Sequence, residues 1–152
     1  MMKKSMCCIC AALFAASVVF AADVPEELGI DRVMALTGVG PVSPEWVEGA
    51  CQYLENYAGF TAAIRPSCVD VAESLDDTGR AVASNMLPQD IFMIALAYPK
   101  DETLPHGVYV PDANVCVLNV AKLAAGGDPN KVQRRIGQET LRAAAILVGM
   151  PP

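Results

Sequence analysis

Histidine is nearly absent from this sequence, whose 152 residues contain only His106. A single imidazole makes no zinc site without carboxylate or thiolate help, because protein zinc sites take several ligands from the chain. Asp101 and Glu102 precede His106 in the same expected loop, where the three would hold a cation only weakly. We therefore interpret His106 as an exposed loop residue.

Basic residues are also few. The chain has 11 Lys and Arg against 17 Asp and Glu, which gives a formal net charge of −6. This sign disfavours nucleic-acid binding, because a nucleic-acid surface must neutralise phosphates with basic side chains. An acidic balance otherwise favours solubility and leaves the partner open, with a protein or peptide as a candidate.

Sequence signatures of several enzyme classes are missing. No glycine-rich phosphate loop follows an expected strand, and no serine, cysteine or aspartate stands in a recognisable nucleophile motif. The chain beyond residue 21 also has no internal repeat, no low-complexity tract and no linker long enough to separate two domains. We interpret it as one run of alternating strands and helices, with no cofactor assigned.

The N-terminus has the pattern of a secretory signal peptide. Lys3 and Lys4 precede residues 6–20, which carry no charge and are almost wholly apolar. Small residues close this run and favour cleavage after Ala21, with cleavage after the next alanine as the alternative. A retained membrane anchor is the rival interpretation, but a spanning helix needs about 20 apolar residues. We expect residues 1–21 to be removed on export to the periplasm or the medium, leaving no membrane anchor.

Removal of this segment leaves residues 22–152 as the mature chain. Taking 21 residues from 152 leaves 131, which is enough for one hydrophobic core and too few for two ordinary domains. Two lysines leave with the signal, so nine basic residues face 17 acidic ones and the formal net charge becomes −8. We expect a single acidic domain over residues 22–152.

The mature chain has three cysteines, which are Cys51, Cys68 and Cys116. An odd number in an oxidising compartment leaves at least one thiol unpaired within the monomer. We favour a disulfide between Cys51 and Cys68, because Cys116 lies between valines in an apolar strand, where a small buried thiol is ordinary. Three reduced cysteines that fill the core are the alternative, since their spacing resembles no metal-ligand pair.

Apolar runs and turn residues indicate alternating elements. Strands are expected at residues 32–38, 60–65, 90–98, 108–110 and 115–120. The run DIFMIALAY at residues 90–98 predicts a central strand that is covered on both faces. The turn residues 111–114 predict that the last two strands form a hairpin or a tight pair.

Helices are expected at residues 43–57, 70–85 and 128–148. Ser43 and Pro44 mark the start of the first helix, and Gly59 marks its end. Gly79 weakens the second helix, and Gly149 ends the third. This order of elements predicts an α/β (α+β) fold with a single mixed β-sheet of about five strands and packed helices.

The last expected helix has six consecutive apolar residues at 143–148, as a buried helix has. At the helical period, Val132, Ile136, Ala143 and Leu147 share the stripe that faces the sheet. Arg142 then lies on a wetter flank.

The segment RAAAILVGMPP at residues 142–152 resembles the metzincin zinc-peptidase motif H-E-x-x-H-x-x-G-x-x-H with its polar residues replaced. Anchored on Gly149, the alignment places Arg142 at the first histidine, Ala143 at the catalytic glutamate, Ile146 at the second histidine and Pro152 at the third. The resemblance implies that no zinc ligand and no catalytic residue remains, because none of these side chains can ligate zinc or take a proton from water.

The rest of residues 31–152 resembles the archaemetzincin branch of this family. The first strand runs into Gly38 and Gly40, the next helix carries Trp46 and Leu54, and the segment GVYVPDANVCVLN leads to the last helix. The resemblance implies the layout of the N-terminal, upper subdomain of metzincins. It also implies a C-terminal truncation, because family members continue past the glycine into a part with cysteines and a methionine-containing turn.

The helix face that would have carried zinc holds Arg135, Glu139, Arg142 and Ile146. Glu139 can pair with either arginine, at roughly 0.3 to 0.5 kcal/mol for an exposed pair. We interpret this face as a solvated ion pair. The alternative is an anion-binding remnant of a cleft, in which the arginine fork binds carboxylate or phosphate.

Three hypotheses for function follow. The first is an exported, catalytically inactive and zinc-free archaemetzincin-like protein with a binding or structural role. The second is a metallopeptidase-related hydrolase that acts through an unrecognised site or one that a partner chain completes. The third is a structural envelope domain unrelated to metzincins, which a fold without the sheet and long terminal helix would favour.

Overall fold

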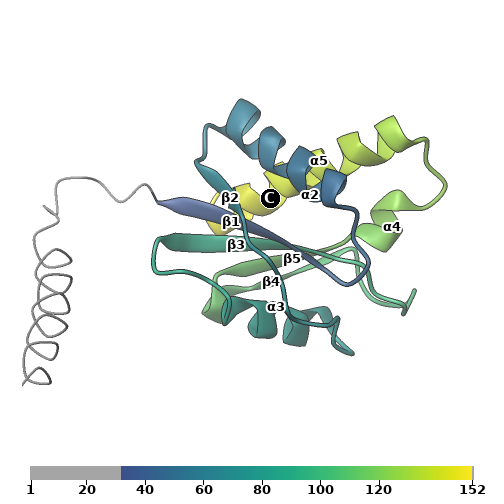
Figure 1. The fold of residues 1–152 in the computed structure, drawn as a ribbon, viewed down its shortest axis with the longest axis horizontal. Coiled ribbons are helices and arrows are strands. Elements are labelled where there is room, and N and C mark those ends of the chain that lie inside the picture. The colour runs from purple at the N-terminus through teal and green to yellow at the C-terminus, as the bar shows by residue number, and fades with distance from the viewer. Residues whose placement is uncertain (1–31, 152) are drawn as a thin grey trace, which may run out of the picture. The chain divides into compact units, whose positions relative to one another are not determined.

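The computed structural model describes residues 32–151, which belong to one compact unit over Asp31–Pro152. The expected signal peptide at residues 1–21 and the expected zinc-motif position Pro152 lie outside the described residues. A five-stranded sheet forms the middle of the described unit, with helices on both of its faces (Figure 1). The predicted α/β fold with one mixed sheet is therefore confirmed.

The sheet has the strand order β2-β1-β3-β5-β4. Its strands are β1 (Val33–Val39), β2 (Ala62–Ile64), β3 (Asp90–Ala97), β4 (Gly107–Val110) and β5 (Val115–Asn119). The first four strands in this order run parallel, whereas β4 is antiparallel to β5. The predicted hairpin is present as the antiparallel pair of β4 and β5. The predicted central strand is β3, which lies in the middle of the sheet and has its last five residues buried.

The main helices are α2 (Pro44–Tyr53), α3 (Leu75–Ala83), α4 (Val120–Ala124) and α5 (Pro129–Leu147). A π-helical turn, η1 (Leu54–Ala58), continues α2, and a 3-10 turn, η2 (Pro111–Ala113), joins β4 to β5. Within residues 32–151 we find no helix that is both long and apolar enough to cross a membrane.

Helices α2 and α5 cover one face of the sheet, and α3 covers the other (Figure 1). The stripe predicted for α5 is confirmed, because all four of its residues are at most 4% exposed and pack into the core on the α2 side; these are Val132, Ile136, Ala143 and Leu147. Arg142 is exposed, as its place on the helix wheel predicts.

The two helices on this face pack closely at Gly137. A Cβ atom there would lie 2.5 Å from Cγ of Tyr53, so the absence of a side chain lets the α5 backbone rest against the tyrosine ring. At Gly49 of α2, a Cβ atom would lie 1.8 Å from Nε2 of Gln133. Each helix therefore presents a glycine to a large side chain of its neighbour, which brings the two axes together.

On the opposite face, α3 begins later than the sequence predicts. Ser74 caps the helix, since its hydroxyl accepts a hydrogen bond from the backbone N–H of Asp77 at 3.0 Å. Residues 70–74 are therefore not helical and lead into the helix instead. Gly79 has a packing role here, because a Cβ atom at this position would lie 2.8 Å from Cγ2 of Val110.

The predicted ends of α2 and α5 are present. Gly59 and Gly149 both adopt the left-handed conformation after these helices, with φ values of 67° and 82°. Ser43 stands at the N-cap position of α2, but its side chain makes no capping hydrogen bond, which differs from the prediction. Pro44 at the first helical position still fixes the start of the helix.

An ion pair joins the end of β2 to the start of β3. The Arg65 guanidinium donates two hydrogen bonds to the Asp90 carboxylate, at 3.0 and 2.7 Å, and the backbone N–H of Leu87 donates a third at 2.8 Å. The Asp90 side chain is completely buried, and Arg65 is 17% exposed. Burial acts to raise the pKa of Asp90, but these hydrogen bonds and the arginine charge outweigh it and lower the pKa.

Candidate binding cleft

Three of the residues aligned with the zinc motif, Arg142, Ala143 and Ile146, line a cleft of about 200 Å³ between β4 and α5. One wall is α5, which contributes Glu139, Arg142, Ala143 and Ile146. The other wall is the edge strand β4 with the residue before it, and two side chains of β5 complete the lining. The cleft opens on the face of the sheet that α2 and α5 cover.

The α5 wall carries one ion pair. Of the two partners that the sequence allows for Glu139, the structure has Arg142, whose Nη1 donates to both carboxylate oxygens at 2.8 and 3.1 Å. The Arg142 side chain is 66% exposed and that of Glu139 is 31% exposed. Because water screens such a pair, its contribution to stability is small.

The other aligned positions on α5 have no polar side chain. Ala143 is 2% exposed and packs in the core, while Ile146 is partly buried at the cleft. Zinc takes thiolate, imidazole or carboxylate ligands. The methyl group of Ala143, the butyl group of Ile146 and the guanidinium of Arg142 are none of these. The residues at these positions therefore do not fit a zinc ion.

Cys116 lies in the cleft lining but is buried. Burial, with a smaller effect of the nearby Glu139 charge, raises the pKa of its thiol to about 11. The thiol is therefore neutral at physiological pH, whereas a metal ligand or nucleophile is a thiolate. Within residues 32–151, we find no group of three His, Cys, Asp or Glu side chains placed to hold a metal.

The strand wall is fixed to the end of β5. The backbone N–H of Asn119 donates to the His106 carbonyl at 2.8 Å, and its Nδ2 donates to the Pro105 carbonyl at 3.1 Å. Asn119 is 1% exposed, so these bonds hold the start of β4 against the sheet from inside. Along β4, Tyr109 pairs in register with Cys116 and is 40% exposed.

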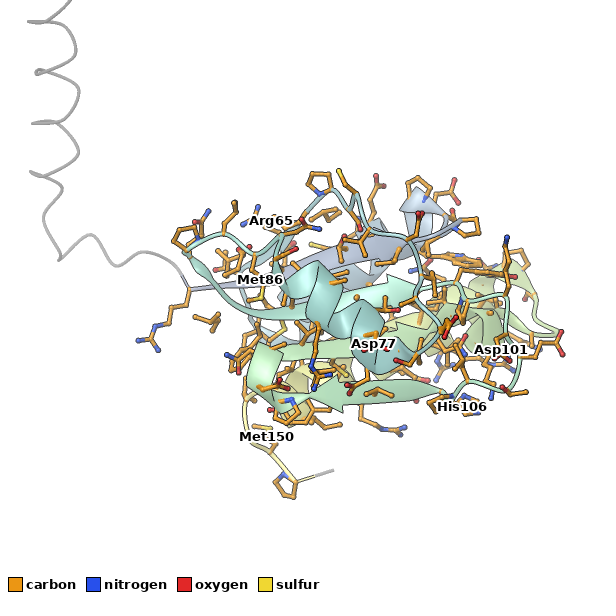
Figure 2. The ribbon with its side chains drawn as sticks, turned by 90° about the horizontal axis from the view of Figure 1, so that it is seen from below. Arg65, Asp77, Met86, Asp101, His106 and Met150 are labelled. Carbon is orange, nitrogen blue, oxygen red and sulfur yellow. The ribbon has the colours of Figure 1, made fainter. Side chains whose placement is uncertain are left out.

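His106 is an exposed loop residue, as its neighbours in the sequence indicate, yet it lines the cleft. Asp101 lies in a different hollow, at the ends of β1 and β3, and bonds locally to Thr103. Figure 2 shows Asp101 and His106 at the same end of the sheet, away from Met86 and Met150. Asp101, Glu102 and His106 do not form a group placed to hold a metal ion, and the described part of the chain contains no such group.

The sequence alone does not indicate that Tyr109 and Cys116 line a common site. Side chains along the segment GVYVPDANVCVLN alternate between the two faces of the sheet. Once the hairpin register is known, this alternation places Tyr109 and Cys116 on one face, because directly paired residues point to the same face. The length of the turn does not decide between two registers that differ by one residue. A shift of one residue would move every side chain of the strand to the other face of the sheet.

The predicted disulfide between Cys51 and Cys68 is not formed in the structure, where both are free thiols. Cys51 belongs to α2 and packs on the core of the α2 side. The chain after β2 crosses to the opposite face, where Val69, next to Cys68, packs on the core of the α3 side. Cys51 and the neighbour of Cys68 therefore pack on opposite faces of the sheet.

Comparisons with known proteins give one structural match. No known protein family profile matches this chain, and no curated protein sequence matches it. The crystal structure of archaemetzincin from Methanopyrus kandleri superposes with a TM-score of 0.55 and 17% sequence identity, covering 84% of this chain and 77% of that one. At this identity the likeness concerns the fold. The chain has an archaemetzincin-like fold.

Proposed function

We propose that this protein is an exported, catalytically inactive archaemetzincin-like protein that binds an extended peptide segment in the cleft between β4 and α5. The observation that carries the proposal is the combination of an open cleft with Arg142, Ala143 and Ile146 at the zinc-motif positions of its helical wall. Metal-assisted hydrolysis needs an acidified water and a carboxylate base. These positions supply neither, so binding is the role that the cleft retains.

The strand wall supports an extended ligand. Among residues 32–151, β4 is the last strand in the sheet order and pairs only with β5, so no described strand pairs with the other edge of its backbone. A free edge can accept the backbone of a peptide as an additional strand, while alternate side chains enter neighbouring hollows. Exposed Tyr109 and partly buried Ile146 offer apolar contacts beside that edge.

Export is proposed from the sequence of residues 1–21. A charged start, an apolar run and small residues before Ala22 are the features that signal peptidases recognise. Fractionation of cells that express the full chain, followed by N-terminal sequencing, tests this proposal. We expect an exported product that begins at Ala22, or at Asp23 if cleavage follows the second alanine. Intact Met1 in the cytoplasmic fraction would contradict export.

The binding role is tested by selecting peptides from a random phage-displayed library against mature protein, residues 22–152. We expect the Ile146→Lys variant to bind the selected peptides at least about tenfold more weakly. A bound peptide would bury the new ammonium group against the cleft wall, and burial of an unpaired charge is costly. Val148→Lys is the matched control, since Val148 lies two residues further on and is 38% exposed.

Two results would contradict the binding proposal. One is a library that yields no peptide above background, and the other is equal loss on both lysine variants. Cleavage of the selected peptides by the purified protein would instead support the hydrolase hypothesis. A fold without the sheet and the long terminal helix would favour the third hypothesis, and this chain has both.

A further inference from the structure

A second hollow, of about 850 Å³, lies where β1 and β3 end. Three segments form its walls, namely the turn after β1, the loop after β3 and the segment that leads into α3. We call it the β1–β3 crevice. Its volume lies within the usual range of small-molecule sites, which is roughly 300 to 1,000 Å³.

The chain topology opens the crevice. After β1 the chain passes through α2 to β2, which lies on one side of β1 in the sheet. After β3 it continues to β4 and β5, which lie on the other side. Neighbouring parallel strands whose connections leave in opposite directions form a topological switch point, and open α/β sheets bind ligands in the crevice that results.

The walls of the crevice are held in place by backbone contacts. The Tyr98 N–H donates to the Val39 carbonyl at 3.1 Å, which continues the pairing of β1 with β3 to the rim. Gly40 follows with φ at 80°, and a Cβ atom there would lie 3.1 Å from Cγ2 of Val71. The Ala72 N–H donates to the buried Thr78 hydroxyl at 3.0 Å, which anchors the third wall to α3.

The lining is apolar at its inner part. Val71 and Leu104 are partly buried and pack against the core on the α3 side, and Pro99 is buried. Tyr98 is partly buried in the same lining. These side chains provide a surface for the apolar body of a ligand.

Charged groups at the crevice are mostly acidic. Asp70, Glu73 and Asp101 are exposed in the lining, and Lys100 is the only cation among the described lining residues, so the lining carries a formal net charge of −2. The charge of Lys122, outside this lining, also acts on Asp101. Thr103 donates to Asp101 through its hydroxyl at 2.7 Å and its N–H at 2.8 Å, and these bonds lower the pKa of that carboxyl. Asp101 is therefore ionised at neutral pH.

We propose that the β1–β3 crevice binds a small organic cation, a primary amine or guanidine carried on an apolar body. The apolar inner wall and the carboxylates at its rim match the two parts of such a molecule. A bare metal ion fits less well, because the described residues contain no group of three acidic, histidine or cysteine ligands placed around one point. The proposal is independent of peptide binding between β4 and α5, so either can fail alone.

The test is a chemical-shift titration of isotope-labelled mature protein with three probes that share one body. Phenethylamine carries a cation, 2-phenylethanol carries no charge, and 3-phenylpropanoate carries an anion. We expect phenethylamine to shift the amide signals of Gly40, Val71 and Tyr98, with at least about tenfold weaker binding of the alcohol and weaker binding still of the carboxylate. Added salt should weaken amine binding, because the rim carboxylates are exposed.

The double variant Asp70→Asn/Glu73→Gln should reduce phenethylamine affinity by at least about tenfold. Both residues are exposed, so the fold should tolerate the change, and circular dichroism checks this. Glu48→Gln/Glu55→Gln is the control, because it removes the same charge from exposed positions of α2 and η1.

Equal binding of the three probes would overturn the proposal, as would shifts that map away from the crevice. Equal losses in the two double variants would overturn it as well, because they would indicate a general charge effect. Binding of a lysine-containing hexapeptide without binding of phenethylamine would assign the crevice to a peptide and also count against a small-molecule site.

Discussion

Arg142 and Glu139 form a hydrogen-bonded ion pair on the cleft wall, with Nη1 of the arginine 2.8 and 3.1 Å from the two carboxylate oxygens. The pair occupies the helix face where the resemblance expects a zinc ligand. Arginine only donates hydrogen bonds and stays charged, so Arg142 can neither ligate a metal nor take a proton from water, and its Nη1 is bonded to the Glu139 carboxylate.

The first prediction compares Leu147→Ala with Arg142→Ala. Leu147 is 4% exposed in the core, so its truncation should cost roughly 2 to 5 kcal/mol of unfolding free energy. Arg142→Ala should cost under about 1 kcal/mol, because the ion pair is solvated. Chemical denaturation measures both. A larger loss for Arg142→Ala would mean that this face is a structured, ligand-holding site, contrary to our account.

The second prediction concerns the contact between α2 and α5. Gly137→Ala should destabilise the protein by about 1 to 3 kcal/mol through overpacking, because its Cβ atom would lie 2.5 Å from the Tyr53 ring. Better helix propensity offsets up to about 1 kcal/mol of that loss. In a Tyr53→Ala background the same change should be neutral or stabilising. Equal effects of Gly137→Ala in both backgrounds would disprove the contact.

The third prediction is a pH dependence that originates at Asp90. Its pKa is lowered in the folded state, so its contribution is present above the unfolded value of about 3.9 and is lost as pH falls through the folded value. Asp90→Asn should lower stability at pH 7 by about 1 to 3 kcal/mol, since Arg65 loses its charged partner. The variant should also show a weaker decline in stability below pH 4.

Asp112→Asn is the matched control for Asp90. Asp112 pairs with Arg80 at 3.4 Å but is 64% exposed, so its replacement should change stability by less than about 0.5 kcal/mol. Urea denaturation at a series of pH values measures both variants. If the Asp90 variant keeps the full acid sensitivity of the wild type, then other carboxylates govern the acid transition.

The fourth prediction ranks the thiols by their reaction with iodoacetamide at pH 8. Exposed Cys68 should react first, and Cys51 more slowly, because burial and then the Glu55 charge raise its pKa. Cys116, with a pKa of about 11, should react only after unfolding. Mass spectrometry of the purified protein, residues 22–152, gives the alkylation pattern. A peptide that joins Cys51 to Cys68 would show that a disulfide forms despite the free thiols of this structure.

Local signals in the sequence predict most of the elements. Pro44 and Gly59 delimit α2 with its π-helical turn, and the apolar period of Val132, Ile136 and Leu147 gives the buried face of α5. Such signals lie within a few residues of the feature that they determine. For that reason the single mixed sheet and the order of elements, except for the short helix α4, could be predicted without a structure.

Features that depend on distant segments could not be predicted in this way. Arg65 and Asp90 are 25 residues apart, and their ion pair follows from β1 lying between β2 and β3. The crossing of the chain after β2 likewise determines where Cys68 lies. Candidate site residues were found only where a family motif marked them, as at Arg142, whereas the β1–β3 crevice arises from strand order, which the sequence does not specify.

The most direct test of the central claim is the zinc content of mature protein, residues 22–152, after equilibrium dialysis against micromolar zinc and metal analysis. We expect well under one equivalent of zinc and no hydrolysis of a fluorogenic peptide, because Arg142, Ala143 and Ile146 offer no zinc ligand. One tightly bound equivalent of zinc per chain, together with peptide cleavage that a chelator abolishes, would contradict the account.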